Sequence, residues 1–250
     1  MPSDWRAVAE SHGIHETIIV EASPWVEDNQ WILDVAATDH SIVGFVGNLD
    51  PRDAQFTINL NRFAQNPLFR GLRWRSDLVP IDRDLDQLAS AAKQLVDLDL
   101  ELDLNGSCQS LPMANRLAES MPKLRIVINH LGASGDPQAI NVDWRKNIDQ
   151  ISKCPNVFMK VSALVEQIPG ESGKAPTNTE YYKPVLDHLW NRFGEDRLIY
   201  GSNWPVSDRG ATYDVVFKIV RDYFMDKGSG AMEKYFWKNS LHAYRWLERA

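Results

Sequence analysis

The segment RLIYGSNWPVS, residues Arg197–Ser207, joins an apolar β-strand to a polar turn. Leu198–Tyr200 favours a strand, and Gly201 lets the backbone turn or be approached closely. Pro205 prevents the strand from continuing in the middle of a sheet, because proline has no amide hydrogen for the ladder. The segment therefore predicts a strand that ends in Ser202–Trp204, where a barrel presents side chains to a ligand. Taken alone, it is equally typical of an ordinary strand-to-loop exit.

The rest of the chain repeats this alternation of strand and helix. Further apolar strands are predicted at Thr17–Glu21, Ile42–Asn48, Gly71–Trp74, Leu98–Leu104, Arg125–His130 and Val157–Ser162. Amphipathic helical stretches separate them, from Asp4–His12 before the first strand to Met232–Trp246 after the last. Strands that alternate with helices predict βαβ units and a parallel sheet.

The number of strands decides between two architectures. A (β/α)₈ barrel needs eight strands, each followed by a helix; seven are recognisable here, and the chain opens on a helix. We predict an α/β, TIM-like barrel in which Asp4–His12 follows a first strand that is missing. The single domain over residues 1–250 is then incomplete at its N-terminus. The alternative is an open doubly wound sheet, but no glycine-rich phosphate loop follows any strand.

Composition and charge exclude several classes of function. The chain has 250 residues, 44% of them hydrophobic, which is enough for a sizeable core. Its net charge of −7, with both signs interspersed, argues against nucleic acid or an anionic membrane as a partner. No apolar run approaches the roughly 18 residues that span a bilayer. Cys108 and Cys154 lack CxxC spacing and indicate a reducing compartment. We expect a cytoplasmic protein, unless missing N-terminal residues include a signal.

Polar side chains end every predicted strand. At the C-terminal edge of a barrel such groups share one pocket, the default signature of a binding or catalytic site. In chain order they are Glu21 with Trp25, Asn48 with Asp50, Arg73 with Arg75, Asp103 with Asn105, Asn129 with His130, Lys160 with Ser162, and Ser202, Asn203 and Trp204. Each also has a structural explanation: Asp50 could cap a helix, and Arg73 could pair with Asp103.

Three of these side chains are the most informative. His130 could bind a metal or exchange protons near neutral pH. Lys160 interrupts an apolar strand, and such a charge is costly to bury unless it contacts a ligand anion or a structural partner. Period-two alternation places Asp99, Glu101 and Asp103 on one face of a strand, with only Asp103 near the pocket.

Four blocks of the chain resemble the amidohydrolase-related branch of the amidohydrolase superfamily. They are Val20–Ala37, Ile42–Trp74, Pro122–Gly132 and Pro155–Ser207, and Lys234–Trp246 resembles the closing helix of that family. The resemblance implies a hydrolytic barrel, supported by one zinc-like divalent metal or metal-independent. Such a barrel adds water to the carbonyl of a small carboxylated or sugar-derived lactone.

The resemblance also implies roles for individual residues. Arg73 and Lys160 resemble contacts to a substrate anion, and His130 resembles the histidine that binds the metal or polarises the carbonyl. The expected catalytic set is His130, Asn203 and Asp103; the expected substrate-binding set is Glu21, Trp25, Arg73, Lys160, Ser162 and Trp204; and His130 is the expected metal ligand.

Two features depart from the pattern of the family. Members begin with a strand that ends in His-x-His, and no such pair occurs in this chain. Asn203 stands where the family usually has the aspartate of a GSDWP motif, which is the general base. A neutral carboxamide cannot take that role. Asp103, Asp208 or Glu21 could substitute for it.

Three interpretations follow from the sequence. The first is a hydrolase of this family that acts on a small molecule, present here as a truncated or mis-started chain, and the second is a non-catalytic barrel that binds small anions. The third is a product with no independent function. A barrel without one strand would expose two sheet edges, so we expect a homo-oligomer if the chain folds.

Overall fold

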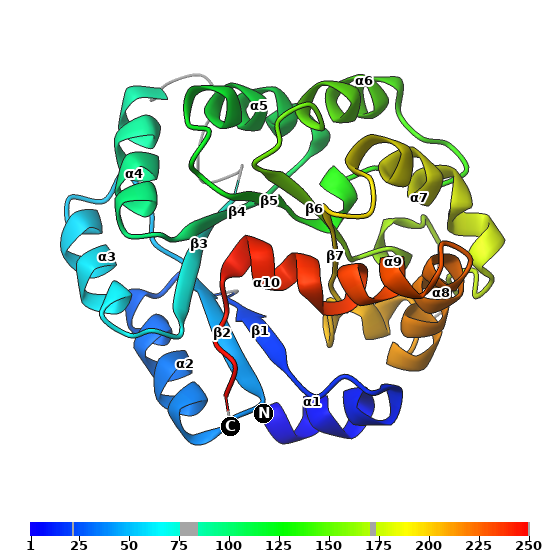
Figure 1. Cartoon of the computed structure of the whole chain (residues 1–250), viewed down its shortest axis with the longest axis horizontal. Helices are drawn as coiled ribbons and strands as arrows, with labels where there is room; N and C mark the ends of the chain where they lie inside the picture. The colour runs from blue at the N-terminus through cyan, green and yellow to red at the C-terminus, as the bar shows by residue number, and fades with distance from the viewer. Residues whose placement is uncertain (22, 76–84, 171–173, 250) are drawn as a thin grey trace.

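The computed structural model describes residues 1–21, 23–75, 85–170 and 174–249 of the chain (Figure 1). Seven parallel strands form one sheet: β1 (Thr17–Val20), β2 (Ile42–Gly47), β3 (Phe69–Arg75), β4 (Glu101–Asn105), β5 (Ile126–Ile128), β6 (Val157–Val161) and β7 (Leu198–Tyr200). They pair in sequence order, each with the next, whereas the order of a doubly wound sheet reverses at its centre. The predicted α/β fold with seven strands is confirmed.

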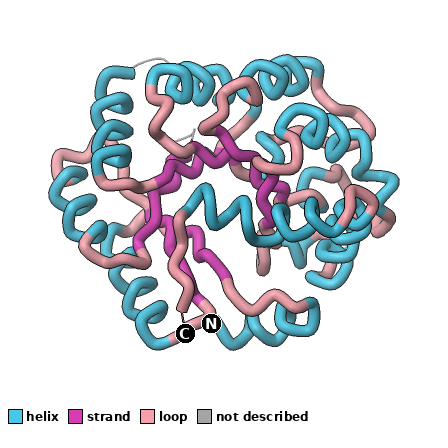
Figure 2. Tube along the Cα trace, viewed as in Figure 1, coloured by secondary structure: helices cyan, strands magenta, loops and turns pink. Residues whose placement is uncertain are grey.

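The sheet is curled, and helices surround its outer face (Figure 2). A helix follows each strand: α2 (Val26–Thr38), α3 (Phe56–Ala64), α4 (Leu85–Asp97), α5 (Leu111–Ser120), α6 (Val142–Ile151), α7 (Thr179–Phe193) and α8 (Tyr213–Met225). The remaining helices are α1 (Pro2–Ala9), which precedes β1, and α9 (Ser229–Glu233) and α10 (Asn239–Tyr244), which a π-helical turn (Lys234–Lys238) joins.

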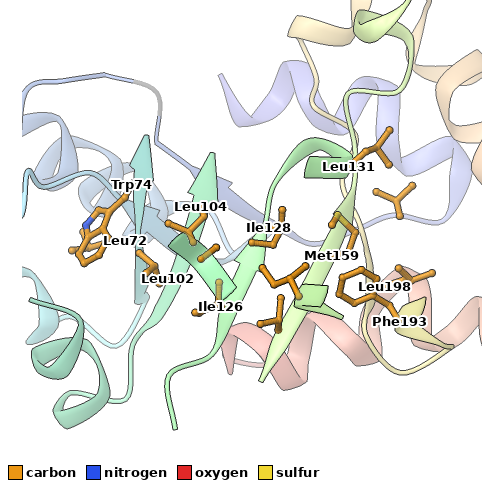
Figure 3. Packing of buried hydrophobic residues seen from close by; sticks show 14 of the residues in the cluster. Leu72, Trp74, Leu102, Leu104, Ile126, Ile128, Leu131, Met159, Phe193 and Leu198 are labelled. Carbon is orange, nitrogen blue, oxygen red and sulfur yellow. The ribbon is translucent and has the colours of Figure 1, made fainter. Parts of the chain in front are cut away.

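The outer apolar layer lies between strands and helices. In α4, residues Leu88, Ala91, Ala92 and Leu95 recur at helical spacing and are all at most 2% exposed. They belong to one cluster with outward-facing strand residues, which Figure 3 shows for Leu72, Leu102, Ile126, Met159 and Leu198, among others. This layer holds the helices against the sheet.

A smaller apolar cluster fills the concave side of the sheet. Successive side chains of a strand point to opposite faces, so Val127, Phe158 and Ile199 meet there. Tyr244 and Trp246 from the C-terminus join them. Figure 1 shows α10 crossing the middle of the ring of strands. Because both faces are covered, all six residues of β2 are buried.

The amino ends of the strands hold α10 in place. Arg125 Nε donates to the carbonyl of Ala243 at 2.7 Å, and Arg70 Nε donates to the carbonyl of Tyr244 at 3.2 Å. Asp99, which the alternation placed in strand β4, lies in the turn before it with φ of 57°. Its side chain binds Arg125 and Arg245, so the prediction of one shared face with Glu101 and Asp103 was wrong for Asp99.

The curled sheet has two edges that do not pair with each other. β1 pairs with β2 and β7 pairs with β6, and within the described ranges neither edge has a second neighbour. All four residues of β1 are only half-buried, in contrast to β2. Helix α1 packs near α8 through Trp5, Val8 and Ala9, which meet Tyr213 and Phe217.

The remaining predictions concern the two cysteines, one helix and membrane-spanning segments. Cys108 and Cys154 are buried free thiols, and burial raises the pKa of each. Residues 82–84 of the predicted helix Asp82–Leu95 lie outside the described residues. No described helix has the length and apolar character needed to cross a bilayer.

Candidate active site

A cavity of about 570 Å³ lies between the two edge strands and reaches the carboxyl ends of β3, β5 and β6. Of the nine residues predicted for the site, six line it: Arg73, His130, Lys160, Ser162, Asn203 and Trp204. Asn129 also lines it, and its buried Oδ1 has no hydrogen-bond partner among the residues described. A buried acceptor of this kind is suited to a ligand or an ordered water.

The other three predicted residues do not line this cavity. Trp25 begins α2 and is 73% exposed. Glu21 is buried after β1, where its carboxylate accepts the backbone N–H of Ser23. Asp103 is fully buried on the concave face, behind Lys160.

Lys160 is held by a buried ion pair. Its Nζ lies 2.7 Å from Asp103 Oδ2, and the hydroxyl of Tyr244 donates to Asp103 Oδ1 at 2.9 Å. Both oxygens of Asp103 are therefore occupied by partners from distant strands and the last helix. Of the two explanations for Lys160, the structural ion pair is present, and the side chain still forms part of the cavity wall.

A second acid lies below this pair. Glu101 is fully buried, and desolvation together with the charge of Asp103 raises its pKa well above the usual range. A neutral Glu101 leaves Asp103 as the counter-charge of Lys160. Gly71 on the neighbouring strand makes room for it, because a Cβ at Gly71 would lie 2.2 Å from Glu101 Oε1.

His130 follows β5 and is kept neutral by its surroundings. Its Nδ1 lies 2.9 Å from Ser162 Oγ. Burial, and then the charge of Lys160, lower the pKa of His130 to about 4. Near pH 7 the ring is therefore an uncharged group that can donate from one nitrogen and accept at the other.

The backbone is unusual at three neighbouring strand ends. His130, Ala163 and Asn203 follow β5, β6 and β7, with φ values of 55°, 53° and 55°. A residue other than glycine in this left-handed region costs of the order of 1 kcal/mol, and such positions cluster at functional sites. The strain supports the assignment of this edge as the functional one.

Glu166 is a residue of the site that the sequence analysis missed. It lies in the turn Val165–Gln167 after β6, and its Oε1 accepts a hydrogen bond from Asn203 Nδ2 at 2.5 Å. Burial raises its pKa. The predicted site residues lie at or near strand ends, whereas Glu166 lies five residues beyond β6. The available signal was an acid between the apolar neighbours Val165 and Ile168.

The residues of the cavity do not fit a zinc site. Zinc in proteins takes three or four His, Cys, Asp or Glu ligands. In the described part of the chain no three such side chains converge. His130 is instead next to the positive charges of Lys160 and Arg73, which lower its pKa and would repel a cation.

Comparison with known proteins shows which protein family the chain matches. Residues 2–246 match the amidohydrolase family Amidohydro_2. An L-fucono-1,5-lactonase of Burkholderia ambifaria is 30% identical over 98% of this chain and 84% of its own length. An L-rhamnono-gamma-lactonase of Scheffersomyces stipitis is 24% identical over 58% of this chain and 48% of its own. The crystal structure of a Burkholderia multivorans amidohydrolase with bound zinc has a TM-score of 0.90 at 21% identity, covering 99% of this chain and 89% of that one.

Proposed function

Because this chain belongs to the amidohydrolase family Amidohydro_2 and is a hydrolase of that family, we propose that it opens a small lactone derived from a sugar acid. The observation that carries the proposal is the meeting of Arg73, His130 and Lys160 in one cavity, in a chain similar to a sugar lactonase. A volume of about 570 Å³ suits a small molecule.

In the proposed reaction, the two cations hold the substrate. Lys160 uses one of its three hydrogens on Asp103 and keeps the others for an oxygen of the ligand. Arg73 lies in the same wall and offers a planar donor set, which suits a carboxylate or a pair of hydroxyls. Fixing the lactone in this way supplies part of the rate enhancement through orientation.

His130 polarises the carbonyl in this proposal. When the Ser162 hydroxyl donates to Nδ1, the proton of the neutral ring is on Nε2 and can be donated to the carbonyl oxygen. Water adds to the carbonyl carbon, negative charge develops on that oxygen, and Lys160 and His130 stabilise it. The ring C–O bond then breaks, and the proton that the added water gives up passes to the ring oxygen, which gives the open hydroxy acid.

The test is hydrolysis of a panel of sugar-acid lactones by the purified chain, followed as acid release above the spontaneous rate. Arg73→Gln should lower kcat/KM roughly 100-fold, as expected for the loss of a charged hydrogen bond. Arg75→Gln is the matched control, because Arg75 is exposed on the same strand and does not line the cavity. Equal activity of the two variants would contradict the proposed binding mode.

A second function is favoured by one observation. Asn203 stands at the position of the base of the family, so a barrel that binds small anions without turnover is the alternative. Calorimetry separates the two functions: binding of a lactone with no hydrolysis would support the alternative. Release of the open acid would exclude it.

We also propose that the sheet corresponds to seven strands of an eight-stranded barrel, with one place open between β7 and β1. The support is the cavity at this seam, whose wall includes Ile18 and Ile19 from one edge and Ile199 from the other. Unpaired edges favour association, so a homo-oligomer in solution is part of this proposal.

A further inference from the structure

The contact between Glu166 and Asn203 decides which end of the asparagine side chain faces the cavity. An ionised carboxylate has no hydrogen to donate, so only the Nδ2 group of Asn203 can satisfy the 2.5 Å contact with Glu166 Oε1. The carboxamide is planar, and its Oδ1 must then be directed away from Glu166. Since Asn203 lines the cavity, we propose that Glu166 is a positioning residue that presents Asn203 Oδ1 to the cavity as a hydrogen-bond acceptor.

The surroundings of Glu166 suit this role. Its Oε2 is buried and has no hydrogen-bond partner in the ranges that the structure describes, so the contact with Asn203 is its main polar interaction there. The next residue, Gln167, donates from Nε2 to the carbonyls of His130 and Ala163. The turn that carries Glu166 is therefore tied to two of the three strained strand ends.

An acceptor at this position has a defined chemical use. Together with the proposed hydrolysis, on which this inference rests, Asn203 Oδ1 would take a hydrogen bond from the attacking water or from a substrate hydroxyl. The aspartate that the family resemblance implies at this position would also offer an acceptor. With Asn203 at this position the cavity keeps a hydrogen-bond acceptor, while the negative charge lies on Glu166, on the far side of Asn203 from the cavity.

When Glu166 is protonated, it no longer fixes the orientation of the Asn203 carboxamide. A protonated acid can donate to Oδ1, so the carboxamide can turn and present Nδ2 to the cavity. Among the described residues, the titratable groups on elements beside Glu166 are Tyr182 on α7, whose hydroxyl donates to the carbonyl of Pro176, and Asp208 and Arg209 on the turn Val206–Arg209, which packs against the turn of Glu166. Burial raises the pKa of Glu166, so the acceptor should be lost at a pH above the ordinary glutamate range.

The first experiment reads the contact directly by NMR. The side-chain amide of Asn203, assigned through its loss in Asn203→Asp, should shift with pH as Glu166 titrates. In Glu166→Gln this shift should disappear, whereas in the surface control Glu180→Gln it should remain. An amide signal that is insensitive to pH, or equally sensitive in Glu166→Gln, would overturn the proposal whether or not the protein hydrolyses lactones.

The second experiment reads the consequence for turnover. Glu166→Leu offers no acceptor to Asn203 and should lower kcat/KM roughly 10- to 100-fold. Glu166→Gln should remove the acidic limb of the pH profile. The exchange Glu166→Gln with Asn203→Asp returns a carboxylate to the cavity, held by the glutamine amide, and should recover activity relative to Glu166→Leu.

The two experiments separate the two claims. If the amide titrates with Glu166 but no lactone is hydrolysed by the wild type, the positioning role stands and the proposed function fails. If lactones are hydrolysed and Glu166→Leu, shown to be folded by its thermal transition, has wild-type kcat/KM and pH profile, the proposed function stands and the positioning role is refuted.

Discussion

The protonation and orientation of single side chains in this site depend more on their neighbours than on their own residue type. His130 is neutral because burial and Lys160 oppose its protonation. Lys160 is paired with Asp103, and Glu166 accepts a hydrogen bond from Asn203. The chemistry available to the cavity is therefore a neutral donor, a fixed cation and an oriented carboxamide.

The neutral state of His130 makes stability depend on pH. Its folded pKa of about 4 lies below the ordinary 6.5, so between these values the unfolded chain binds more protons. This contribution to stability is complete above pH 6.5 and is lost as the pH falls towards 4. The shift corresponds to about 3 kcal/mol at most. Urea unfolding should show that the free energy of unfolding falls more steeply with decreasing pH in the wild type than in His130→Gln. An equal dependence on pH in the two proteins would contradict this prediction.

The ion pair of Lys160 predicts an asymmetric response to mutation. Lys160→Met leaves Asp103 buried without its partner, and the free energy of unfolding should fall by about 3–5 kcal/mol. Replacing both residues, as in Lys160→Met with Asp103→Leu, removes the uncompensated charge and should restore much of the loss. Chemical denaturation measures both variants. A double variant no more stable than the single one would refute the coupling.

At the level of elements, the residues of the candidate site lie at strand ends, because the carboxyl ends of parallel strands meet at one edge of the sheet. This rule predicted nine residues from the sequence, and six of them line one cavity, among them Arg73, Lys160 and Asn203. It could not find Glu166, which lies in a turn beyond its strand. Nor could it find Tyr244, which is 141 residues away from its partner Asp103. Contacts between distant segments depend on packing that no local pattern encodes.

The seven strands were predictable for a physical reason. Apolar β-formers between amphipathic helices leave few arrangements that bury both faces of a sheet. The start of β4 was not predictable, because the alternation of acids and leucines extends past Asp99 into a turn. There a left-handed backbone and two arginines determine the geometry.

Close packing between β3 and β4 gives a prediction for one glycine. Gly71→Ala would place a methyl 2.2 Å from Glu101 Oε1 and 2.6 Å from the Glu101 carbonyl oxygen. We expect a loss of about 1–3 kcal/mol, typical of overpacking. Gly230→Ala is the control, because beyond the neighbouring backbone of its own helix no atom lies within 4 Å of its added methyl. Thermal unfolding compares the two, and equal transition temperatures would be inconsistent with the packing described.

At the scale of the whole molecule, the curled sheet has edges at β1 and β7. All residues of the neighbouring strand β2 are buried, whereas the residues of β1 are half-buried. Association through these edges would protect their backbone groups. Sedimentation velocity should therefore show a species larger than the 28.5 kDa chain. A monomer across the concentration range would exclude the predicted homo-oligomer.

We propose above all that the cavity between the sheet edges opens lactones. The most direct test is the initial rate of acid release from a sugar-acid lactone by the purified chain, beside Arg73→Gln and the spontaneous reaction. We expect turnover by the wild type, saturable in lactone and reduced roughly 100-fold in the variant. A rate equal to the spontaneous one across the panel of lactones would contradict it.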